Sequence, residues 1–424
     1  MEEFFVDMEN FDTLIIGGGP AGLMAAIRAS SLGQKVAVAE KNHSFGEKLL
    51  LSGKGRCNFT NAESNMDTFV SRYGDNGKFL YSAFSKFGPL RTREWFSHIG
   101  VKFVEERGKR IFPKEGGSQR VLDALLMQCK KNGVKLMRST PVTAIKMNNH
   151  HIDYVITDSS EYRADKYIIA TGGKSYPKTG STGDGYDFAR RAGHTITPLY
   201  PSLVPVRTRE TWPKLASGCD LRNVRLTVIV GGKKITDRFG EMEFTNFGVS
   251  GPIVMELSQY VPDWLKHDDG TKAELEFSLD MKPTLTHEIL TKRIERDIWE
   301  HSGYGKFSGL VRSLVPAKMM ALFLELSDIP ADKPTDFMSS KEIGDTVALL
   351  KDIRMTVNGL WSFDHAMVTR GGVSLNEVNP SSMMSKICDN LYFAGEVLDL
   401  NGPSGGFNLQ VCWSTGYVAG SVKE

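Results

Sequence analysis

A glycine-rich turn near the start of the chain is the first stretch whose residue types could support chemistry. Residues 17–22 read Gly-Gly-Gly-Pro-Ala-Gly and satisfy the G-x-G-x-x-G spacing. In such a turn Gly17 permits the tight bend, Gly19 lets backbone approach a diphosphate, and Gly22 allows a helix to pack closely on a strand. Glu40 lies where the next strand is expected to end, and a carboxylate there accepts hydrogen bonds from ribose hydroxyls. These residues predict a dinucleotide-binding turn.

Two further glycine segments indicate which dinucleotide binds. Residues 170–173, Ala-Thr-Gly-Gly, close an expected strand, and residues 392–396, Tyr-Phe-Ala-Gly-Glu, close another near the C-terminus. Both resemble the second and third signatures of FAD-binding enzymes of the glutathione-reductase structural group. In that group the first segment crosses near the cofactor, and the glycine-acid pair of the second contacts the ribityl and pyrophosphate region. A simple NAD dehydrogenase would not show this arrangement, so the resemblance implies FAD.

Longer strings along nearly the whole chain resemble one family of bacterial flavoproteins, the HI0933-like family, also called BaiN-like or aminoacetone-oxidase-like. These strings are Gly46-x-Lys48, 52–61, 110–113, 170–185, 244–245, 250–252, 368–373, 385–386 and 395–410. One position departs from the pattern, because Asn246 stands where the family usually has His. Since Asn does not titrate near neutrality, a proton-donating role at this position is in doubt here.

The resemblance implies both a fold and a set of cofactor contacts. The implied fold class is α/β: a Rossmann-type, glutathione-reductase-like FAD-binding domain with an inserted β-rich domain and a small helical subdomain. The residues expected to bind FAD are Gly17, Gly19, Pro20, Ala21, Gly22, Glu40, Lys41, Lys48, Ser52, Gly53, Gly55, Arg56, Cys57, Asn58, Val142, Thr171, Gly172, Gly173, Gly183, Asp184, Gly395, Glu396, Gly405, Gly406, Phe407, Asn408 and Leu409.

Two of these segments have the composition of a wall around a flavin ring. The loop 52–61 places Gly53 and Gly55, which permit close backbone approach, beside side chains that donate hydrogen bonds. Residues 405–408 precede the last expected helix, whose N-terminus would favour negative charge on reduced flavin. The catalytic groups expected near the ring are Arg56, Asn58 and Asn408, with Lys48 and Tyr176 as weaker candidates.

Other chemistries receive little support from the sequence. Cys57 has Arg56 beside it, which could stabilise a thiolate, but no resolving cysteine lies nearby, so packing or flavin contact is the favoured role. The nine histidines show neither an H-E-x-x-H motif nor paired Cys/His ligand spacing, so no metal site is expected. Residues 402–406 fit the G-x-S-x-G hydrolase elbow, but no histidine follows His365.

The elements that must position these residues follow from hydrophobic patterning. Short β-branched runs predict strands at 13–16 and 35–39 with a helix between them, so the glycine turn lies between a strand and a helix. Between about 200 and 280 the pattern alternates as in a β-rich domain, and it then becomes helical, with Ser340 as an expected N-cap. Further strands are expected at 135–136, 142–145, 152–156, 167–170, 353–357 and 391–394, and a final helix at 408–421.

The domain organisation follows from this order of elements. A discontinuous FAD-binding domain is expected at 1–196 and 367–424, because its signatures occur near both ends. A β-rich, barrel-like domain is expected at 197–283 and 352–366, and a helical insertion at 284–351. The substrate would enter between these domains.

Composition restricts the location and the partners. The 424 residues carry a formal net charge of +2, which gives no overall attraction to nucleic acid or to an anionic membrane. Five dispersed cysteines without a C-x-x-C pair suit a reducing cytoplasm. The start of the chain is acidic where a signal peptide would be basic, so export is not expected. No apolar run reaches about 18 residues, so a membrane anchor is not expected either. The densest basic stretch (Lys109, Arg110, Lys130, Lys131) is interleaved with Glu105, Glu106 and Glu115, which favours a solvated face over an RNA-binding patch. RNA binding stays open as an alternative.

These observations predict an enzyme, an FAD-dependent oxidoreductase that transfers hydride or electrons between bound flavin and a small-molecule substrate. A second Rossmann domain for NADH or NADPH is not evident, and reduction by transiently bound NADH or NADPH stays open. Three alternatives stay open: a flavin-dependent reductase that converts uracil to dihydrouridine in ribosomal RNA, an amine oxidase, and a flavin-binding redox sensor without enzymatic activity. The sequence leaves open the substrate, the electron donor and acceptor, and the oligomeric state.

Overall fold

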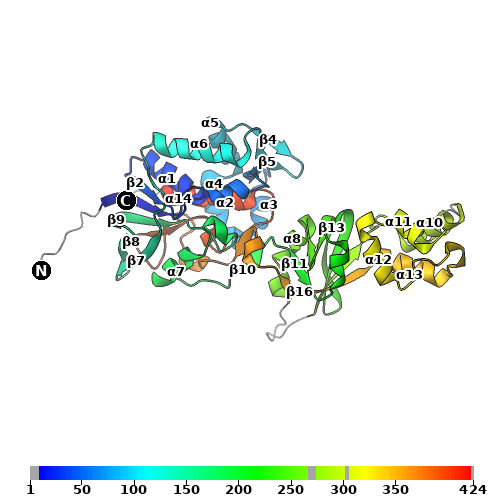
Figure 1. Ribbon diagram of the computed structural model, residues 1–424. Coiled ribbons are helices and arrows are strands. Elements are labelled where there is room, and N and C mark those ends of the chain that lie inside the picture. Colours follow the sequence, from blue (N-terminus) through cyan, green and yellow to red (C-terminus); the bar gives the residue numbers. More distant parts are fainter. Residues whose placement is uncertain (1–8, 266–273, 301–304, 422–424) are drawn as a thin grey trace. The chain divides into compact units, whose positions relative to one another are not determined.

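The chain divides into two compact units. The computed structural model describes residues 9–265, 274–300 and 305–421. One unit comprises Met1–Pro201 with Ala366–Glu424, and the other comprises Ser202–His365 (Figure 1). The first unit is thus discontinuous in sequence, and the exact domain boundaries at 196, 283, 352 and 367 stay predictions.

The first unit begins with the expected strand, turn, helix and strand. β1 (Glu9–Ile16) pairs in parallel with β2 (Val36–Ala39), whose residues are all buried. Between them, α1 (Pro20–Ser31) begins directly after Gly19, and proline fits its first turn because no backbone N–H is needed there. The helix ends before Gly33, whose φ of +86° is accessible to glycine without strain.

Strand β9 (Glu161–Ile169) lies at the centre of the sheet of the first unit. One edge pairs in parallel with β1, and the other edge is shared between antiparallel β8 (His151–Thr157) and parallel β18 (Leu391–Phe393). The strand order is β6-β2-β1-β9-β8-β7, with β18 beside β9, where β6 is Lys135–Met137 and β7 is Val142–Asn148. Because β1, β2, β6, β9 and β18 are mutually parallel, their carboxyl ends meet at one edge, where α/β folds bind ligands.

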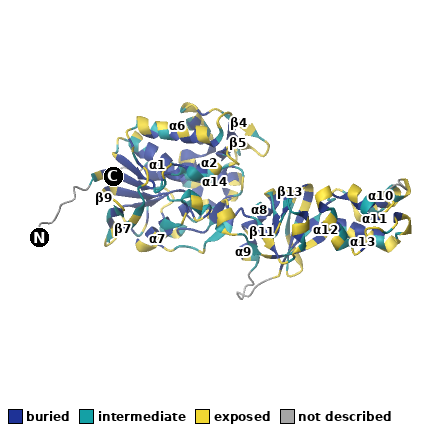
Figure 2. Cartoon of the chain, in the orientation of Figure 1, coloured by how far each residue is buried: buried dark blue, intermediate teal, exposed yellow. Residues whose placement is uncertain are grey.

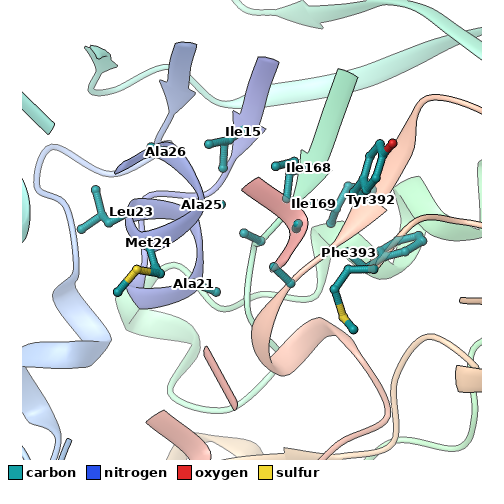
Figure 3. Close-up of a cluster of buried hydrophobic side chains, with 14 of the residues drawn as sticks. Ile15, Ala21, Leu23, Met24, Ala25, Ala26, Ile168, Ile169, Tyr392 and Phe393 are labelled. Atoms are coloured by element: carbon teal, nitrogen blue, oxygen red, sulfur yellow. The ribbon is translucent and has the colours of Figure 1, made fainter. Parts of the chain in front are cut away.

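Helix α14 (Phe407–Gly420) packs on α1 through glycines. A Cβ added at Gly416 would lie 2.3 Å from the carbonyl oxygen of Ala21, and one added at Gly420 would lie 2.4 Å from that of Ala25. The two helices therefore meet backbone to backbone. Figure 3 shows the buried side chains of α1 in one cluster with those of β9 and β18.

The segments between the sheet strands of the first unit form helices and a small sheet. This antiparallel sheet has the order β3 (Thr60–Asn61), β5 (Arg110–Pro113) and β4 (Phe103–Glu106). The helices are α2 (Glu47–Leu51), α3 (Met66–Ser71), α4 (Tyr81–Phe87), α5 (Pro89–His98), α6 (Gly117–Lys131) and α7 (Asp184–Arg191).

Two short strands mark where the chain leaves and re-enters the first unit. β10 (Tyr200–Ser202) lies at the point of departure, and β17 (Val368–Arg370) follows the return at Ala366. These strands pair with each other, so the departing and returning segments lie side by side. The second unit is therefore an insertion between neighbouring strands.

The second unit contains a closed β-barrel with the order β11-β14-β13-β12-β15-β16, closed by pairing of β11 with β16. Leu226 and Val228, two residues apart on β12, are both fully buried, as inward positions of a barrel strand should be. The strands are β11 (Val206–Thr208), β12 (Asp220–Val230), β13 (Lys233–Thr245), β14 (Gly248–Ser250), β15 (Leu275–Asp280) and β16 (Ile353–Leu360).

The helices of the second unit share one hydrophobic core with the barrel. Phe307, Leu310 and Phe323 are fully buried in the same cluster as the inward residues of the barrel strands. Figure 2 shows burial concentrated in the sheet of the first unit and in the barrel of the second. The helices are α8 (Pro252–Ser258), α9 (Val261–Trp264), α10 (His287–Glu300), α11 (Phe307–Leu314), α12 (Met320–Ser327) and α13 (Ser340–Lys351).

The predicted N-cap of α13 was wrong by one residue. Ser339, not Ser340, caps the helix, and its backbone is extended with ψ of 157°. The Ser339 hydroxyl accepts from the Glu342 N–H, and the Glu342 carboxylate accepts from the Ser339 N–H. This reciprocal capping box needs the serine three residues before the glutamate, which selects Ser339.

Candidate cofactor site

The glycine turn after β1 has the shape that a dinucleotide needs. Gly17 has a φ of +106°, and a Cβ on it would lie 2.6 Å from the carbonyl oxygen of Ala170. A Cβ on Gly22 would lie 2.0 Å from the Gly17 oxygen, so both positions exclude any side chain. Around a Cβ built on Gly19, by contrast, no heavy atom of the described residues lies within 4 Å. That space adjoins the N-terminus of α1, whose first N–H groups have no partner within the helix and attract anions.

Glu40 is fixed at the end of β2 by two backbone groups. Its carboxylate accepts hydrogen bonds from the N–H of Gly18 (2.8 Å) and the N–H of Asn42 (2.9 Å). The residue is 8% exposed, and this burial raises the pKa of its carboxyl, against the effect of the two hydrogen bonds. The carboxylate therefore lies beside the glycine turn, where the sequence predicted a ribose-binding acid.

Glu396, which follows β18, is at the centre of a polar network. It forms an ion pair with Lys48 of α2 (Nζ to Oε2, 2.7 Å). Its Oε1 accepts from the Ser175 hydroxyl (3.0 Å) and from the N–H of Thr369 (2.7 Å). Four segments that are distant in sequence thus meet at one carboxylate. Lys48 and Glu396 were predicted as site residues, and the structure brings them together.

Sequence reasoning did not assign roles to Ser175 and Thr369. Both lie within strings that resemble the family, at 170–185 and 368–373. A serine or threonine gives no chemical signal by itself, however, because its partners are set by the tertiary fold. Only the position of both residues in otherwise glycine-rich strings could have marked them.

The segments 41–42 and 179–184 also lie together. Lys41 forms an ion pair with Asp184 (2.6 Å), and its Nζ also donates to the Thr182 hydroxyl. The Asn42 amide donates to the Thr179 carbonyl (3.1 Å). Gly183 precedes α7 with a φ of +96°. Lys41, Gly183 and Asp184, predicted as cofactor residues, therefore lie on one stretch of surface near Glu40.

The loop 52–61 docks on the segment that leads into α14. The Asn61 amide donates to the carbonyl of Gly405 (3.1 Å), and the Thr60 hydroxyl donates to Gln410 Oε1 (2.6 Å). A Cβ added at Gly406 would lie 2.3 Å from the Thr60 oxygen. These contacts bring together the two segments that were predicted to surround the flavin ring.

The two asparagines predicted to be catalytic hold these loops in place. With its amide oriented to suit its neighbours, Asn58 accepts from the Gly406 N–H (3.0 Å) and donates to the carbonyls of Thr60 and Ile111. Asn408 accepts from the Gly402 N–H (2.8 Å) and donates to the Gly402 carbonyl (2.8 Å). Their predicted place near the flavin ring stays a prediction.

Arg56 has partners of its own on the surface. It forms an ion pair with Glu106, and its guanidinium lies 4.3 Å from the ring centroid of Phe112. Its side chain is 56% exposed. The weaker candidate Tyr176 has a φ of +51°, which is unfavourable for a residue with a side chain. For both residues a catalytic role stays a prediction.

The remaining predicted residues lie in the same unit. Cys57 is fully buried, and burial raises the pKa of its thiol to about 12, which suits packing and not redox chemistry. The Thr171 hydroxyl is buried without a hydrogen-bond partner among the described residues, and a ligand group would satisfy it. Val142 begins β7. The other predicted residues lie in or beside the segments described above: Ser52, Gly53, Gly55, Gly172, Gly173, Gly395, Phe407 and Leu409.

Asn246 belongs to the second unit. It is exposed in the turn between β13 and β14, beside Phe247, whose ring stacks on Trp361 with centroids 3.4 Å apart. Arg207 lies 5.5 Å from the same Trp361 ring. An aromatic and cationic cluster therefore adjoins the position at which the family usually has histidine.

Two further findings concern metals and membranes. Within residues 9–265, 274–300 and 305–421, no group of three or more His, Cys, Asp or Glu side chains is arranged to hold a metal ion. In the same part of the chain, no helix has both the length and the apolar character to cross a bilayer.

Three comparisons place the chain among known proteins. The family model described as HI0933-like protein Rossmann domain matches residues 11–422. A 3-dehydro-bile acid delta(4,6)-reductase of Clostridium scindens is 31% identical over 409 residues, which cover 96% of this chain and 97% of that protein. A ribosomal RNA dihydrouridine synthase of Haemophilus influenzae is 29% identical over 410 residues, which cover 96% and 97%.

The fold also matches the solved structure of a dehydrogenase. A 3-ketosteroid-delta4-(5alpha)-dehydrogenase from Rhodococcus jostii RHA1 superposes with a TM-score of 0.53 at 13% identity, covering 99% of both chains. The Rossmann-type family model, the closed barrel of the second unit and this match together confirm the predicted fold class. The resemblance found in the sequence is confirmed by the family match: this chain belongs to the HI0933-like family and is an FAD-dependent oxidoreductase.

Proposed function

We propose that the protein reduces a carbon–carbon double bond conjugated with a carbonyl group in a small molecule, with NADH or NADPH as electron donor. The observation that carries the proposal is the full-length similarity to two reductases of this kind. The delta(4,6) double bonds of a 3-dehydro bile acid are conjugated with its carbonyl group. The double bond that is lost when uridine becomes dihydrouridine is also conjugated with a carbonyl group. The shared chemistry defines the class of substrate.

The residues of the first unit would hold the cofactor as follows. When bound, FAD would supply the two-electron chemistry that links oxidation of the nicotinamide to reduction of the substrate double bond. The turn at Gly17–Gly19 and the first N–H groups of α1 bind the diphosphate, and Glu40 accepts from the ribose hydroxyls. The Lys48–Glu396 pair serves the ribityl and pyrophosphate region.

The segment before α14 would act on the charge of the reduced ring. Gly405 and Gly406 come directly before α14, and both have a positive φ, which glycine adopts without strain. The positive end of the helix dipole there favours negative charge. Asn58 and Asn408 hold this segment through Gly406 and Gly402. We propose this holding role for both asparagines, since their amides are engaged with backbone.

A small molecule is favoured over RNA as substrate by the surface charge. Lys109 pairs with Glu63 (2.7 Å), and Arg110 lies 4.0 Å from Glu106. These acids neutralise part of the densest basic stretch, whereas binding of RNA phosphates needs unneutralised positive charge.

A reductase of ribosomal RNA is the second candidate, favoured by the Haemophilus influenzae relative. It makes a separate prediction. A strain lacking the gene would lose one dihydrouridine from its ribosomal RNA, detected by mass spectrometry of nuclease fragments, and the unchanged gene would restore it. Restoration by a Gly17→Val variant, which should not hold FAD, would argue against this activity.

The proposal is tested by anaerobic reduction of the purified holoprotein. NADH and NADPH are added separately, and bleaching of the flavin absorbance is followed by stopped flow. The reduced protein is then mixed with a 3-oxo-Δ4 steroid, with a saturated 3-oxo steroid as matched control, and with transcripts of ribosomal RNA. We expect reoxidation by the unsaturated compound only. Flavin that neither nicotinamide reduces, or that the saturated ketone reoxidises equally well, would contradict the proposal.

A further inference from the structure

Thr369 lies where three segments of the candidate site meet. Its hydroxyl accepts hydrogen bonds from the backbone N–H groups of Lys174 (2.8 Å) and Ser175 (3.1 Å). Its own N–H donates to Glu396 Oε1 (2.7 Å), and the residue is fully buried. One residue thus holds both the turn that follows β9 and the carboxylate that follows β18.

The turn after β9 fits tightly against Thr369. A Cβ added at Gly173 would lie 2.4 Å from Thr369 Oγ1 and 3.0 Å from Glu396 Oε1. The Ser175 hydroxyl, 3.3 Å from Thr369 Oγ1, donates to Glu396 and accepts from Lys48 Nζ (2.6 Å). A displacement of Thr369 would therefore disturb the Lys48–Glu396 pair through two routes, its own N–H and Ser175.

The position of Thr369 in the chain explains how it reaches the site. It is the middle residue of β17, which follows the return of the chain into the first unit at Ala366. The Ser175 hydroxyl also lies 3.5 Å from the carbonyl oxygen of Met367, two residues earlier. The returning strand is therefore anchored to the same network as the carboxylate.

We propose that Thr369 is a positioning residue for the FAD site: it fixes Glu396 directly, and Lys48 through Ser175, in the arrangement that bound FAD requires. The inference rests on the proposed function, which assigns Glu396 and Lys48 to the cofactor. Contact between Thr369 and the cofactor is not required. Replacing the hydroxyl by a methyl group removes the acceptor of two backbone N–H groups at nearly constant volume, and buried N–H groups without a partner are unfavourable.

The test measures FAD affinity of the full-length protein. Apoprotein is titrated with FAD, the dissociation constant is obtained from the change in flavin fluorescence, and the absorption spectrum of the saturated protein is recorded. Thr369→Val is compared with Thr369→Ser, which keeps the hydroxyl. Thr13→Val is the matched control. Thr13 lies on β1, before the glycine turn, and is also fully buried in the first unit. Its hydroxyl donates to Gln34 Oε1 (2.7 Å).

We expect Thr369→Val to weaken FAD binding by about tenfold or more, the equivalent of one buried hydrogen bond, and to shift the flavin spectrum. Thr369→Ser should keep both the FAD affinity and the flavin spectrum of the unsubstituted protein. Thr13→Val should lower the midpoint of thermal unfolding without changing the dissociation constant. Ser175→Ala removes one donor to Glu396 and is a milder variant for use if Thr369→Val does not fold. It should weaken binding in the same direction.

Unchanged FAD affinity and an unchanged spectrum in Thr369→Val would overturn the inference, and so would unchanged affinity in Ser175→Ala where Thr369→Val does not fold. An equal loss of affinity in Thr369→Ser or in Thr13→Val would also overturn it, because the effect would then reflect general destabilisation. Failure of the unsubstituted protein to take up FAD would instead refute the proposed function. The two failures are distinguishable because the second is seen before any substitution is made.

Discussion

Gly18 demonstrates how closely the first turn is packed at the scale of single residues. A Cβ added there would lie 2.1 Å from the Phe45 ring, although the fingerprint leaves this position open to any residue. Gly17 and Gly22 are restricted by backbone atoms, which cannot move away as a side chain can. The turn therefore excludes a side chain at Gly17 and Gly22, and at Gly18 a side chain would have to displace the Phe45 ring. Gly19 differs because the neighbouring space is open.

Gly17→Ala should abolish tight FAD binding, because its Cβ would meet the Ala170 carbonyl oxygen at 2.6 Å in a left-handed backbone conformation. Urea denaturation should show a loss of about 2 kcal/mol or more in the free energy of unfolding. Gly33→Ala is the matched control, since Gly33 has a similar φ of +86° but no heavy atom of the described chain within 4 Å of the added Cβ. That control should lose about 1 kcal/mol and keep its FAD affinity. Equal FAD affinity in both variants would contradict the prediction.

Cys57 should resist alkylation in the native protein. Its thiol is fully buried with a pKa raised to about 12, so the reactive thiolate is scarce at pH 8. The measurement is mass spectrometry of tryptic peptides after brief treatment with iodoacetamide, with urea-unfolded protein as the positive control. Rapid labelling of Cys57 in the folded state would revive a redox role for this residue.

Side-chain partners mark the limit of prediction from sequence at this scale. The close packing at Gly17 and Gly22 was predictable, because a local turn sets it. The place of Glu40 beside that turn was predictable from the strand, turn, helix and strand order. The ion pair of Arg56 with Glu106 was not, because it joins residues 50 positions apart on different elements. Thr369 was missed for the same reason.

At the scale of elements, the glycines of α14 set how closely the last helix approaches the first. Strands and helices with strong local patterns were predicted, among them β1, β2, α1 and α14. Helices α3, α4 and α5 were not, because their stability comes from distant aromatic partners. The Phe69 ring centroid lies 4.9 Å from that of Phe407, and Phe87 stacks on Tyr417 at 4.5 Å. Short helices that depend on such packing leave a weak local signal.

Gly416→Ala should destabilise the protein, against the usual effect of alanine in a helix. Its Cβ would lie 2.3 Å from the Ala21 carbonyl oxygen, so α14 must move away from α1. The matched control is Gly344→Ala in α13, where no heavy atom of the described residues lies within 4 Å of the added Cβ. Thermal unfolding should show Gly344→Ala to be more stable by about 0.5 to 1 kcal/mol, and Gly416→Ala to be less stable than the unsubstituted protein. Stabilisation by both substitutions would show that the helices are less closely packed than described.

At the scale of the whole molecule, each unit has a hydrophobic core of its own. The core of the first unit includes residues from both ends of the described chain, and that of the second joins barrel and helices. A discontinuous domain could be predicted, because signatures of one cofactor occur near both termini. Its exact limits could not, because β10 and β17 are short strands whose pairing is set by the fold.

The first unit should hold FAD without the second. Because β10 and β17 pair, Ser202 can be joined to Val368 by a flexible linker of about six glycine and serine residues. We expect this shortened protein to bind FAD with an affinity close to that of the full chain. Isothermal titration with FAD is the measurement. A shortened protein that folds, as judged by circular dichroism, but binds no FAD would disprove the independence of the unit.

The packing of α14 on α1 also determines the order of events during translation. The ribosome releases α1 early, but its partner helix at residues 407–420 emerges only after the whole of Ser202–His365. The inserted unit can therefore complete its core first, since domains fold as units while the chain is still being synthesised. Nascent chains stalled before residue 407 should consequently contain a folded barrel and an unfinished nucleotide cradle, which must await the final helix.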